Sequence, residues 1–313
     1  MNLKRNQEGY LVIDEKSVEP KFVQSDERVW LFFENDGKRY FFKGENYVTN
    51  TDYEILAGYI ADAVGIDAVK YFPAVFVDKD GNKICGVACE DYTMGGQNLK
   101  LNGRALVNYC QAQGNTIENQ IEGLENFLID AQAKFKGQII YDKRKIQNSL
   151  FKMLIFDTFT LNTDRAPRNI EYLLKKVDQN VWEVSLAPIY DNSQIFGSES
   201  FDKRISIINS IDNDAPLPQK VLKNTKLLFG TEDCTDFESV AKIISEQTMF
   251  NPYLKMVTEN FKKLNLDELY NQITKENPGY KITGDTIKIA KKVLDGTIKE
   301  NALFKRKRFN FEF

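Results

Sequence analysis

Three side chains within residues 161–197 have the types and spacing that phosphoryl transfer requires. Asp164 and Asn169 lie five positions apart in a Pro-containing loop, and Asp191 follows an apolar run further along the chain. Two strand-like runs joined by a polar turn, over residues 170–187, lie between Asn169 and Asp191. We therefore expect a hairpin that returns Asp191 to the neighbourhood of Asn169. Carboxylate and amide oxygens suit Mg²⁺, which keeps waters and phosphate oxygens as its other ligands.

The chain contains no histidine, which excludes His-based triads, His metal ligands and imidazole bases. Acid–base chemistry therefore falls to carboxylates, Lys, Tyr or Cys. Phosphoryl transfer needs a carboxylate for the acceptor hydroxyl, a cation on the phosphates and Mg²⁺ ligands. We assign Asp164 as the base, and Asn169 and Asp191 as the Mg²⁺ ligands.

The N-terminal part supplies the cation and a partner for it. Two strand-like runs flank an Asp-Gly turn at 35–37, which predicts a hairpin, and Lys43 ends its second strand. A helix is predicted over about residues 51–64, with a capping-box pattern at its start and Gly65 at its C′ position. Lys43 can reach the phosphates, and Glu54, one turn into the helix, can pair with Lys43 and aim it.

Each of these residues also has a purely structural explanation. Lys43 suits a solvated strand end, and Glu54 suits the acceptor of a capping box. Asp164, Asn169 and Asp191 suit ordinary turns, in which Asn, Asp and Pro are common. Taken singly, the structural explanation is favoured for each residue. The joint order of strand lysine, helix glutamate, D-x-x-x-x-N, hairpin and aspartate reverses that preference, because the whole pattern rarely arises by accident.

Strand-like and helical patterns divide the chain into two parts. Residues 1–91 are predicted as strands plus one helix, and residues 92–313 as mostly helical, with a long amphipathic helix over 143–159. The polar stretch 198–218 is predicted as a mobile surface segment. We therefore expect an α+β fold of two lobes, in which the catalytic loop and metal-binding hairpin of residues 161–197 belong to the helical lobe and face the β-rich lobe.

Composition restricts the class of protein. The 313 residues, 42% hydrophobic and 28% charged, are ordinary for a soluble globular protein and sufficient for two lobes. The net charge of −3 provides no global basic field for nucleic acid. No apolar run is long enough to span a membrane, and the N-terminus has no apolar signal-peptide core. We expect a cytoplasmic protein without a membrane span.

Several segments resemble HipA-like kinases, a family of bacterial proteins also described as phosphatidylinositol 3/4-kinase-like. NTDRAPRN and LAPIYDNSQIFG are similar to the family's catalytic segment, whose pattern is close to N-x-D-R-H-x-x-N and L-A-P-x-Y-D. Residues 19–22 resemble the P-K-F after the family's phosphate loop, residues 40–43 its strand lysine, and residues 53–57 its helix glutamate. The similarity spans roughly residues 8–200, and the C-terminal third matches only in helical character.

The resemblance implies a two-lobed protein-kinase-like fold, ATP and Mg²⁺ as cofactors, and phosphorylation of Ser or Thr in a protein acceptor, including autophosphorylation. It supports Asp164 as base, and Asn169 and Asp191 as metal ligands. It also implies a hinge, at residues 90–92, that reads adenine through backbone groups. The nucleotide-binding residues that follow from the pattern and the resemblance are Lys43, Glu54, Lys21, Glu90, Asp91 and Tyr92.

In HipA toxins a serine of the phosphate loop is the autophosphorylation site. Ser17 is the nearest candidate in this chain, with Ser193, Ser198 and Ser200 as rivals. The resemblance also allows an effector that is secreted without a classical signal peptide.

Three departures from the family pattern carry expectations of their own. Ala166 stands where the family has His, so whatever that His supports is lost or replaced. The phosphate loop around residues 16–19 has no glycine, although a backbone cradle for phosphates usually needs one. The chain begins almost directly at the kinase core, which argues against the additional N-terminal subdomain of HipA toxins, an antitoxin partner and direct DNA binding.

Three hypotheses for the function follow. The favoured one is an ATP/Mg²⁺-dependent Ser/Thr protein kinase. The second is a phosphoinositide kinase with the same residues, because one phosphoryl-transfer site can serve different hydroxyl acceptors. The third is a nucleotide-binding pseudokinase or toxin-like interaction module, for which Ala166 and the glycine-free loop are the support.

Overall fold

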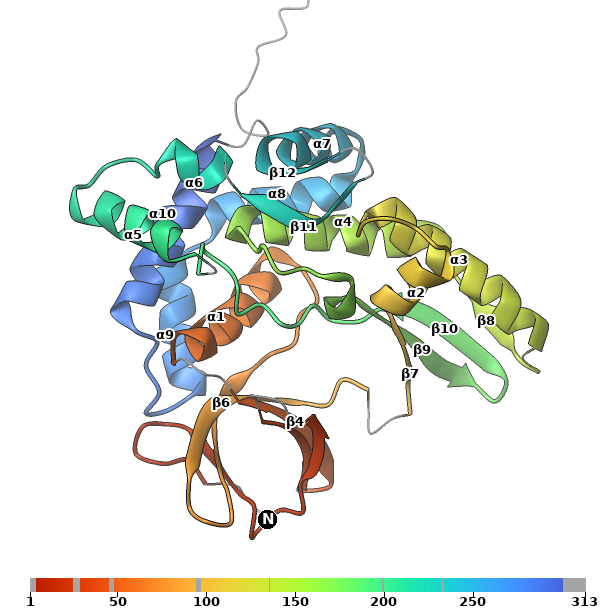
Figure 1. Ribbon diagram of the computed structural model, residues 1–313, viewed down its shortest axis with the longest axis horizontal. Helices are drawn as coiled ribbons and strands as arrows, with labels where there is room; N and C mark the ends of the chain where they lie inside the picture. The colour runs from red at the N-terminus through yellow and green to blue at the C-terminus, as the bar shows by residue number, and fades with distance from the viewer. Residues whose placement is uncertain are drawn as a thin grey trace, which may run out of the picture.

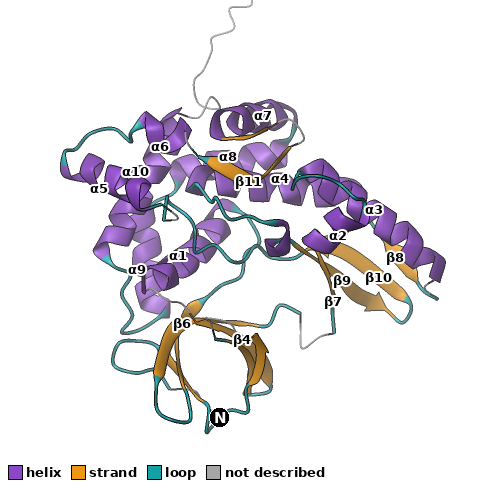
Figure 2. Ribbon diagram, viewed as in Figure 1, coloured by secondary structure: helices purple, strands orange, loops and turns teal. Residues whose placement is uncertain are grey.

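The structure is a computed structural model that describes residues 4–24, 29–44, 48–93, 97–134, 136–198, 200–223, 225–231 and 234–300. A β-rich N-terminal part is followed by a mostly helical C-terminal part (Figure 1, Figure 2). This α+β architecture confirms the fold class predicted from the sequence.

The N-terminal part forms one six-stranded sheet of order β1-β5-β6-β4-β3-β2. Its strands are β1 (Leu11–Asp14), β2 (Lys21–Gln24), β3 (Trp30–Asn35), β4 (Lys38–Gly44), β5 (Phe72–Val77) and β6 (Lys83–Glu90). β1 pairs with β5 in parallel, and the other pairs are antiparallel. The predicted Asp-Gly hairpin joins β3 to β4, and both turn residues, Asp36 and Gly37, have the positive φ that such a turn requires.

Alternation along β4 places Lys43 on the face of the sheet that meets a helix. Successive side chains of a strand point to opposite faces. Phe42 packs with the buried residues of one face, whereas Val87 and Cys89 of β6 belong to the main core, together with helix α1 (Val48–Val64). Lys43, next to Phe42, therefore points toward α1. Figure 1 shows α1 between the sheet and the C-terminal helices.

The expected capping box at the start of α1 is wrong. The helix begins at Val48, so Thr51 already lies inside it, and its buried hydroxyl has no hydrogen-bond partner in the described part of the chain. Glu54 pairs with Lys43 and with a backbone N–H. The end of the helix is as predicted, since Gly65 has a φ of 82°.

The C-terminal part is built around α4, which packs against α3, α7, α8 and α10. Its helices are α2 (Gly103–Tyr109), α3 (Ile117–Lys134), α4 (Lys143–Thr160), the short 3₁₀ helix η1 (Pro167–Asn169), α5 (Phe201–Asp212), α6 (Gln219–Lys223), α7 (Phe237–Phe250), α8 (Pro252–Lys263), α9 (Leu266–Glu276) and α10 (Gly284–Glu300). The predicted helix over 143–159 is thus α4. The stretch 198–218, expected to be a mobile surface segment, instead contains α5, because Ser200 caps the helix and Ile207 is buried in the core.

A second, four-stranded sheet has the order β7-β9-β10-β8, and its strands β9 and β10 follow the loop of Asp164. Its strands are β7 (Leu99–Asn102), β8 (Gln138–Ile140), β9 (Glu171–Asp178) and β10 (Val181–Leu186), and a two-stranded sheet is formed by β11 (Lys226–Thr231) and β12 (Cys234–Asp236). β9 and β10 form the antiparallel hairpin that the sequence predicts between Asn169 and Asp191. Within the described residues, every helix is too short or too polar to cross a bilayer.

Candidate active site

Lys43 lies between two carboxylates from distant parts of the chain. Its Nζ is 2.7 Å from Glu54 Oε1 in α1 and 2.6 Å from Asp191 Oδ1 after β10. The side chains of Lys43 and Glu54 are 4% and 0% exposed, whereas that of Asp191 is 22% exposed. The ammonium group therefore joins sheet, helix and hairpin, and Asp191 keeps access to solvent. A lysine at the end of a strand is usually a solvated charge, so the burial of Lys43 depends on the distant segments that supply Glu54 and Asp191.

Glu54 also holds the backbone of the hairpin. Its second oxygen, Oε2, accepts a hydrogen bond of 2.8 Å from the N–H of Asn192. Asp191, just before it, has a φ of 55°, in the left-handed region that non-glycine residues adopt infrequently. A carboxylate that is bonded to a lysine and to a backbone N–H at once cannot leave its place without breaking both contacts.

The loop of Asp164 is shaped by amide side chains. Asn162 Oδ1 accepts from the N–H of Asp164 at 3.2 Å, and Asn169 Nδ2 donates to the Asp164 carbonyl at 2.9 Å. The Asp164 carboxylate is half-exposed and lies 3.4 Å from Arg168 Nη2. Burial, followed by the negative charge of Asp191, raises the pKa of the Asp164 carboxyl above its ordinary value. Asp164 therefore lies in an environment that increases its affinity for a proton, as a general base requires.

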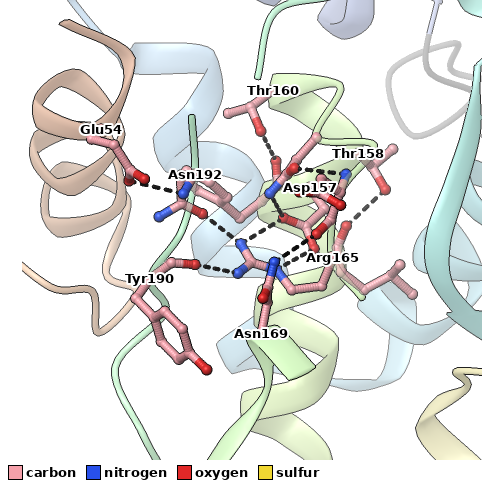
Figure 3. Close-up of polar contacts among 12 residues, drawn as sticks. Glu54, Asp157, Thr158, Thr160, Arg165, Asn169, Tyr190 and Asn192 are labelled. Atoms are coloured by element: carbon pink, nitrogen blue, oxygen red, sulfur yellow. Dashed lines mark hydrogen bonds and ion pairs between the residues drawn. The ribbon is translucent and has the colours of Figure 1, made fainter. Parts of the chain in front are cut away.

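Arg165, next to Asp164, is fully buried and links the loop to the hairpin (Figure 3). Its Nε and Nη2 donate to the two oxygens of Asp157 in α4, at 3.1 and 3.0 Å. Its Nη1 donates to the carbonyl of Tyr190 at 2.6 Å, and Nη2 also donates to Asn192 Oδ1 at 2.5 Å. We did not single out Arg165 from the sequence. Its signals in the sequence are its position directly after the predicted base and its match to the Arg of the family pattern N-x-D-R-H-x-x-N.

A cavity of about 280 Å³ lies between the first sheet and the C-terminal part. Lys43, Asn169 and Asp191 line it, and Arg168, the neighbour of Asp164, does so as well. The remaining wall is largely aromatic. The aromatic residues are Trp30, Phe32, Phe41, Tyr71, Tyr92 and Tyr190.

Tyr92 and Tyr190 form a fixed pair in this wall. Their rings stack with centroids 6.2 Å apart. The Tyr92 hydroxyl donates to Glu171 Oε2 at 2.6 Å, and the Tyr190 hydroxyl donates to the Arg168 carbonyl at 2.8 Å. Burial, and then the charge of Glu171, raise the pKa of both phenols, so they stay protonated donors. A flat, apolar wall with polar groups at one end suits a nucleobase.

The predicted hinge residues take three different positions. The side chain of Glu90 is exposed and pairs with Lys38. The carboxylate of Asp91 is buried and accepts hydrogen bonds from Thr93 N and Thr93 Oγ1 at 2.9 and 2.6 Å. Tyr92 lines the cavity, as do Asp91 and Thr93.

The backbone N–H groups of the predicted phosphate loop are hydrogen-bonded to Asp14. The N–H groups of Lys16, Ser17 and Val18 all donate to Asp14, the first to its side chain and the others to its carbonyl. A phosphate would have to compete with Asp14 for these donors. Lys21, exposed and opposite Phe32 in the sheet, lines a larger cavity of about 880 Å³ beside the smaller one.

The four candidate serines differ in accessibility. Ser17 is exposed and lines the larger cavity. Ser193 is buried, and its carbonyl accepts a hydrogen bond from Ser198 Oγ. Ser200 caps α5 through its side chain.

The donor set of the cavity fits Mg²⁺ better than a softer metal. The described residues contain no group of three or more His, Cys, Asp or Glu side chains suited to a metal. Asn169 uses its amide NH₂ on the Asp164 carbonyl, which leaves the amide oxygen as the metal donor, and Asp191 supplies a carboxylate. One amide and one carboxylate suffice for Mg²⁺, because it takes most of its ligands from water and phosphate.

The chain has the kinase-like fold of the HipA type. The structure is similar to the crystal structure of the proinflammatory kinase CtkA of Helicobacter pylori, with a TM-score of 0.64 and 15% identity over 92% of this chain and 95% of that chain. It is also similar to HipA of Shewanella oneidensis MR-1, solved with HipB and operator DNA, with a TM-score of 0.52 and 11% identity over 90% of this chain and 65% of that chain.

Searches by sequence add no closer relative. No protein-family profile matches the chain, and no curated protein is similar to it in sequence. The relationship with the HipA-like kinases, predicted from short motifs, is therefore confirmed at the level of the fold.

Proposed function

We propose that the protein is an ATP- and Mg²⁺-dependent protein kinase that transfers the γ-phosphoryl group of ATP to a Ser or Thr hydroxyl. One observation carries the proposal: Lys43, Asn169 and Asp191 line a single cavity, and Asp164 contacts both Asn169 and Arg168 beside it. These residues come from both parts of the chain and match the parts that phosphoryl transfer needs.

Each residue has a role in this proposal. Lys43, aimed by Glu54, binds the phosphates, and the nucleobase lies against the aromatic wall near Asp91 and Tyr92. Mg²⁺, held by Asn169 and Asp191, would neutralise charge on the phosphates. Asp164 accepts the proton of the acceptor hydroxyl. Burial raises the pKa of the Asp164 carboxyl, which suits a base, and the proton that it accepts remains on the carboxyl until solvent removes it.

The acceptor in the proposal is a Ser- or Thr-containing protein, including the kinase itself. Ser17 is the preferred site of autophosphorylation, because it is exposed, whereas Ser193 is buried. Neither DNA nor an antitoxin is part of the proposal.

A labelling experiment tests the proposal. The protein is incubated with radiolabelled ATP and Mg²⁺, alone, with a generic basic protein, or with phosphoinositide vesicles. We expect label on the protein itself and on the basic protein, its loss in Asp164→Ala and Asp191→Ala, and unchanged labelling in Asp80→Ala, an exposed turn residue. Full activity in either active-site variant, or label only on the lipid, would overturn the proposal. Nucleotide binding without transfer to any acceptor would identify a pseudokinase.

A further inference from the structure

Asp191 is held in an unusual backbone conformation by contacts on either side of it. Its φ is 55°, whereas an L-residue is most stable at negative φ. The carbonyl of Tyr190 accepts from Arg165, and so does the side chain of Asn192, whose N–H donates to Glu54. The residues before and after Asp191, Tyr190 and Asn192, are therefore both fixed (Figure 3). The Asp191 carboxylate accepts from Lys43 and lines the cavity.

The shape of the Arg165 guanidinium suits it to fix the residues on either side of Asp191. It contacts Asp157 through Nε and Nη2, Tyr190 through Nη1 and Asn192 through Nη2. A planar fork with donors in fixed directions can serve partners on two segments at once, and a lysine ammonium cannot reproduce that geometry. Three of these contacts are buried and the one to the Tyr190 carbonyl is partly buried, and hydrogen bonds shielded from water are electrostatically strong.

Asp157 connects the same arginine to the base. Its Oδ1 also accepts from Asn162 Nδ2 at 2.8 Å, and Asn162 in turn holds the N–H of Asp164. The carbonyl of Arg165 itself accepts from Asn115 at 2.7 Å. The base and the hairpin carboxylate are thus fixed to one buried carboxylate in α4.

From this geometry we infer that Arg165 and Asn192 are positioning residues that hold Asp191 in its left-handed conformation for the divalent cation. The inference rests on the proposed function, because it assigns the metal to Asp191. Neither residue touches the nucleotide. Their effect on metal binding passes through the backbone of residues 190–192.

A purely structural role would give a different result from a positioning role. If Arg165 and Asn192 only stabilise the fold, their replacement lowers the midpoint of unfolding and leaves the metal affinity of the folded protein unchanged. If they position Asp191, metal affinity falls in protein that is still folded. Loss of residues that orient metal ligands typically weakens metal binding about 10- to 100-fold.

The test compares two variants with a matched control. Asn192→Ala removes one contact of Arg165 and leaves the Arg165–Asp157 pair intact, so it is the variant expected to fold. Arg165→Lys keeps the buried charge and loses the forked geometry. The control is Asn148→Ala, which removes an amide that accepts from Asn251 Nδ2 at 2.7 Å between α4 and α8. Binding of Mn²⁺, with a non-hydrolysable ATP analogue present, is measured by electron paramagnetic resonance, and folding by urea denaturation.

We expect Mn²⁺ binding to weaken by about 10- to 100-fold in both site variants, while the Asn148→Ala control binds as wild type does. Affinity for the analogue without metal should change by less than about threefold. Wild-type Mn²⁺ affinity in folded Asn192→Ala would overturn the inference. If the wild type binds neither Mn²⁺ nor the analogue, the proposed function fails first, so the two failures are distinguishable.

Discussion

Asp164 and Asp191 are two neighbouring carboxylates with different partners. Asp191 is 2.6 Å from the Lys43 ammonium, whereas Asp164 lies 3.4 Å from the exposed Arg168. Burial and the charge of Asp191 raise the pKa of Asp164. In the proposed function these two neighbouring carboxylates take separate roles, Asp191 as a metal ligand and Asp164 as the base.

We predict that Asp164→Asn stabilises the protein at neutral pH while reducing its activity by about 10²- to 10⁴-fold. A raised pKa means that the folded state disfavours the ionised carboxylate, so the neutral amide removes a cost. As the pH falls through the raised pKa, the wild type takes up a proton and recovers that stability. The gain in Tm should therefore shrink as the pH is lowered.

Thermal unfolding of both proteins at about pH 7.5 and at more acid pH tests this, with Asp80→Asn as an exposed control. An equal gain in Tm at every pH would contradict the assigned shift. The raised pKa also predicts that wild-type kcat/KM decreases on the acid side at a pH above the ordinary value for Asp, about 3.9.

At the scale of the elements, helix α1 belongs to the N-terminal part of the chain but is also fixed to the C-terminal helices. Besides Glu54 it carries the buried Asp52, whose carboxylate accepts from the hydroxyl of Tyr280, from Thr283 N at 3.0 Å and from Thr286 Oγ1 at 3.2 Å. Thr283 directly precedes α10, so Asp52 fixes α1 to the start of that helix. An anion at this position also complements the positive end of the helix dipole.

Asp52→Ala should reduce the free energy of unfolding by at least about 1–3 kcal/mol, because several buried donors lose their acceptor. The matched control is Asp62→Ala on the same helix. Asp62 pairs with Lys70 at the surface with its side chain 58% exposed, so its loss should cost less than about 1 kcal/mol. Urea denaturation measures both. Equal effects would show that Asp52 does not fix α1 to α10.

The approach of β6 to β4 leaves room only for hydrogen at Gly86. A Cβ there would lie 2.1 Å from the carbonyl of Lys43. Gly86→Ala must therefore displace β4 at Lys43, the residue proposed to bind the phosphates, with an expected loss of about 1–3 kcal/mol of stability and weaker nucleotide binding.

Gly284→Ala is the control, because a Cβ at that position meets nothing within 4 Å. We expect it to be neutral or slightly stabilising. Calorimetric titration with the ATP analogue, together with urea denaturation, measures both consequences. Unchanged nucleotide affinity in Gly86→Ala would contradict the proposed role of Lys43 in phosphate binding.

For the molecule as a whole, the cavity is formed only when sheet and helices are together. Trp30, Phe32 and Phe41 come from the sheet, whereas Asn169 and Tyr190 come from the C-terminal part. We propose that the chain divides into lobes near residues 91 and 92, and that the nucleotide contacts both. Binding should then stabilise the two lobes as one unit, by about 2.7 kcal/mol at a ligand concentration of 100 Kd.

Tryptophan fluorescence provides a direct measurement of this contact. The chain has two tryptophans, of which Trp30 lines the cavity and Trp182 lies in β10. Addition of the Mg²⁺-ATP analogue should change the emission of the wild type and of Trp182→Phe. The change should be lost in Trp30→Phe. A signal that instead follows Trp182 would place the nucleotide outside the cavity.

Much of the candidate site follows from local sequence patterns. The Asp-Gly hairpin, the strand that ends in Lys43, the helix with Glu54 and the hairpin before Asp191 each depend on residue types at short spacing, and the structure contains all four elements. The absence of histidine by itself restricts acid–base chemistry to carboxylates, Lys, Tyr or Cys. The roles of these residues stay predictions until they are measured.

Tertiary structure decided which polar residues are buried and what they contact. Nothing local distinguishes Arg165 or Asp52 from solvated charges, or Ser193 from an exposed serine. Their partners are up to 234 positions away, as for Asp52 and Thr286. The capping box failed for the same reason, since Glu54 is held by Lys43 and Asn192. Short-range spacing determines which elements form, whereas the burial and pairing of a charge depend on segments that only folding brings together.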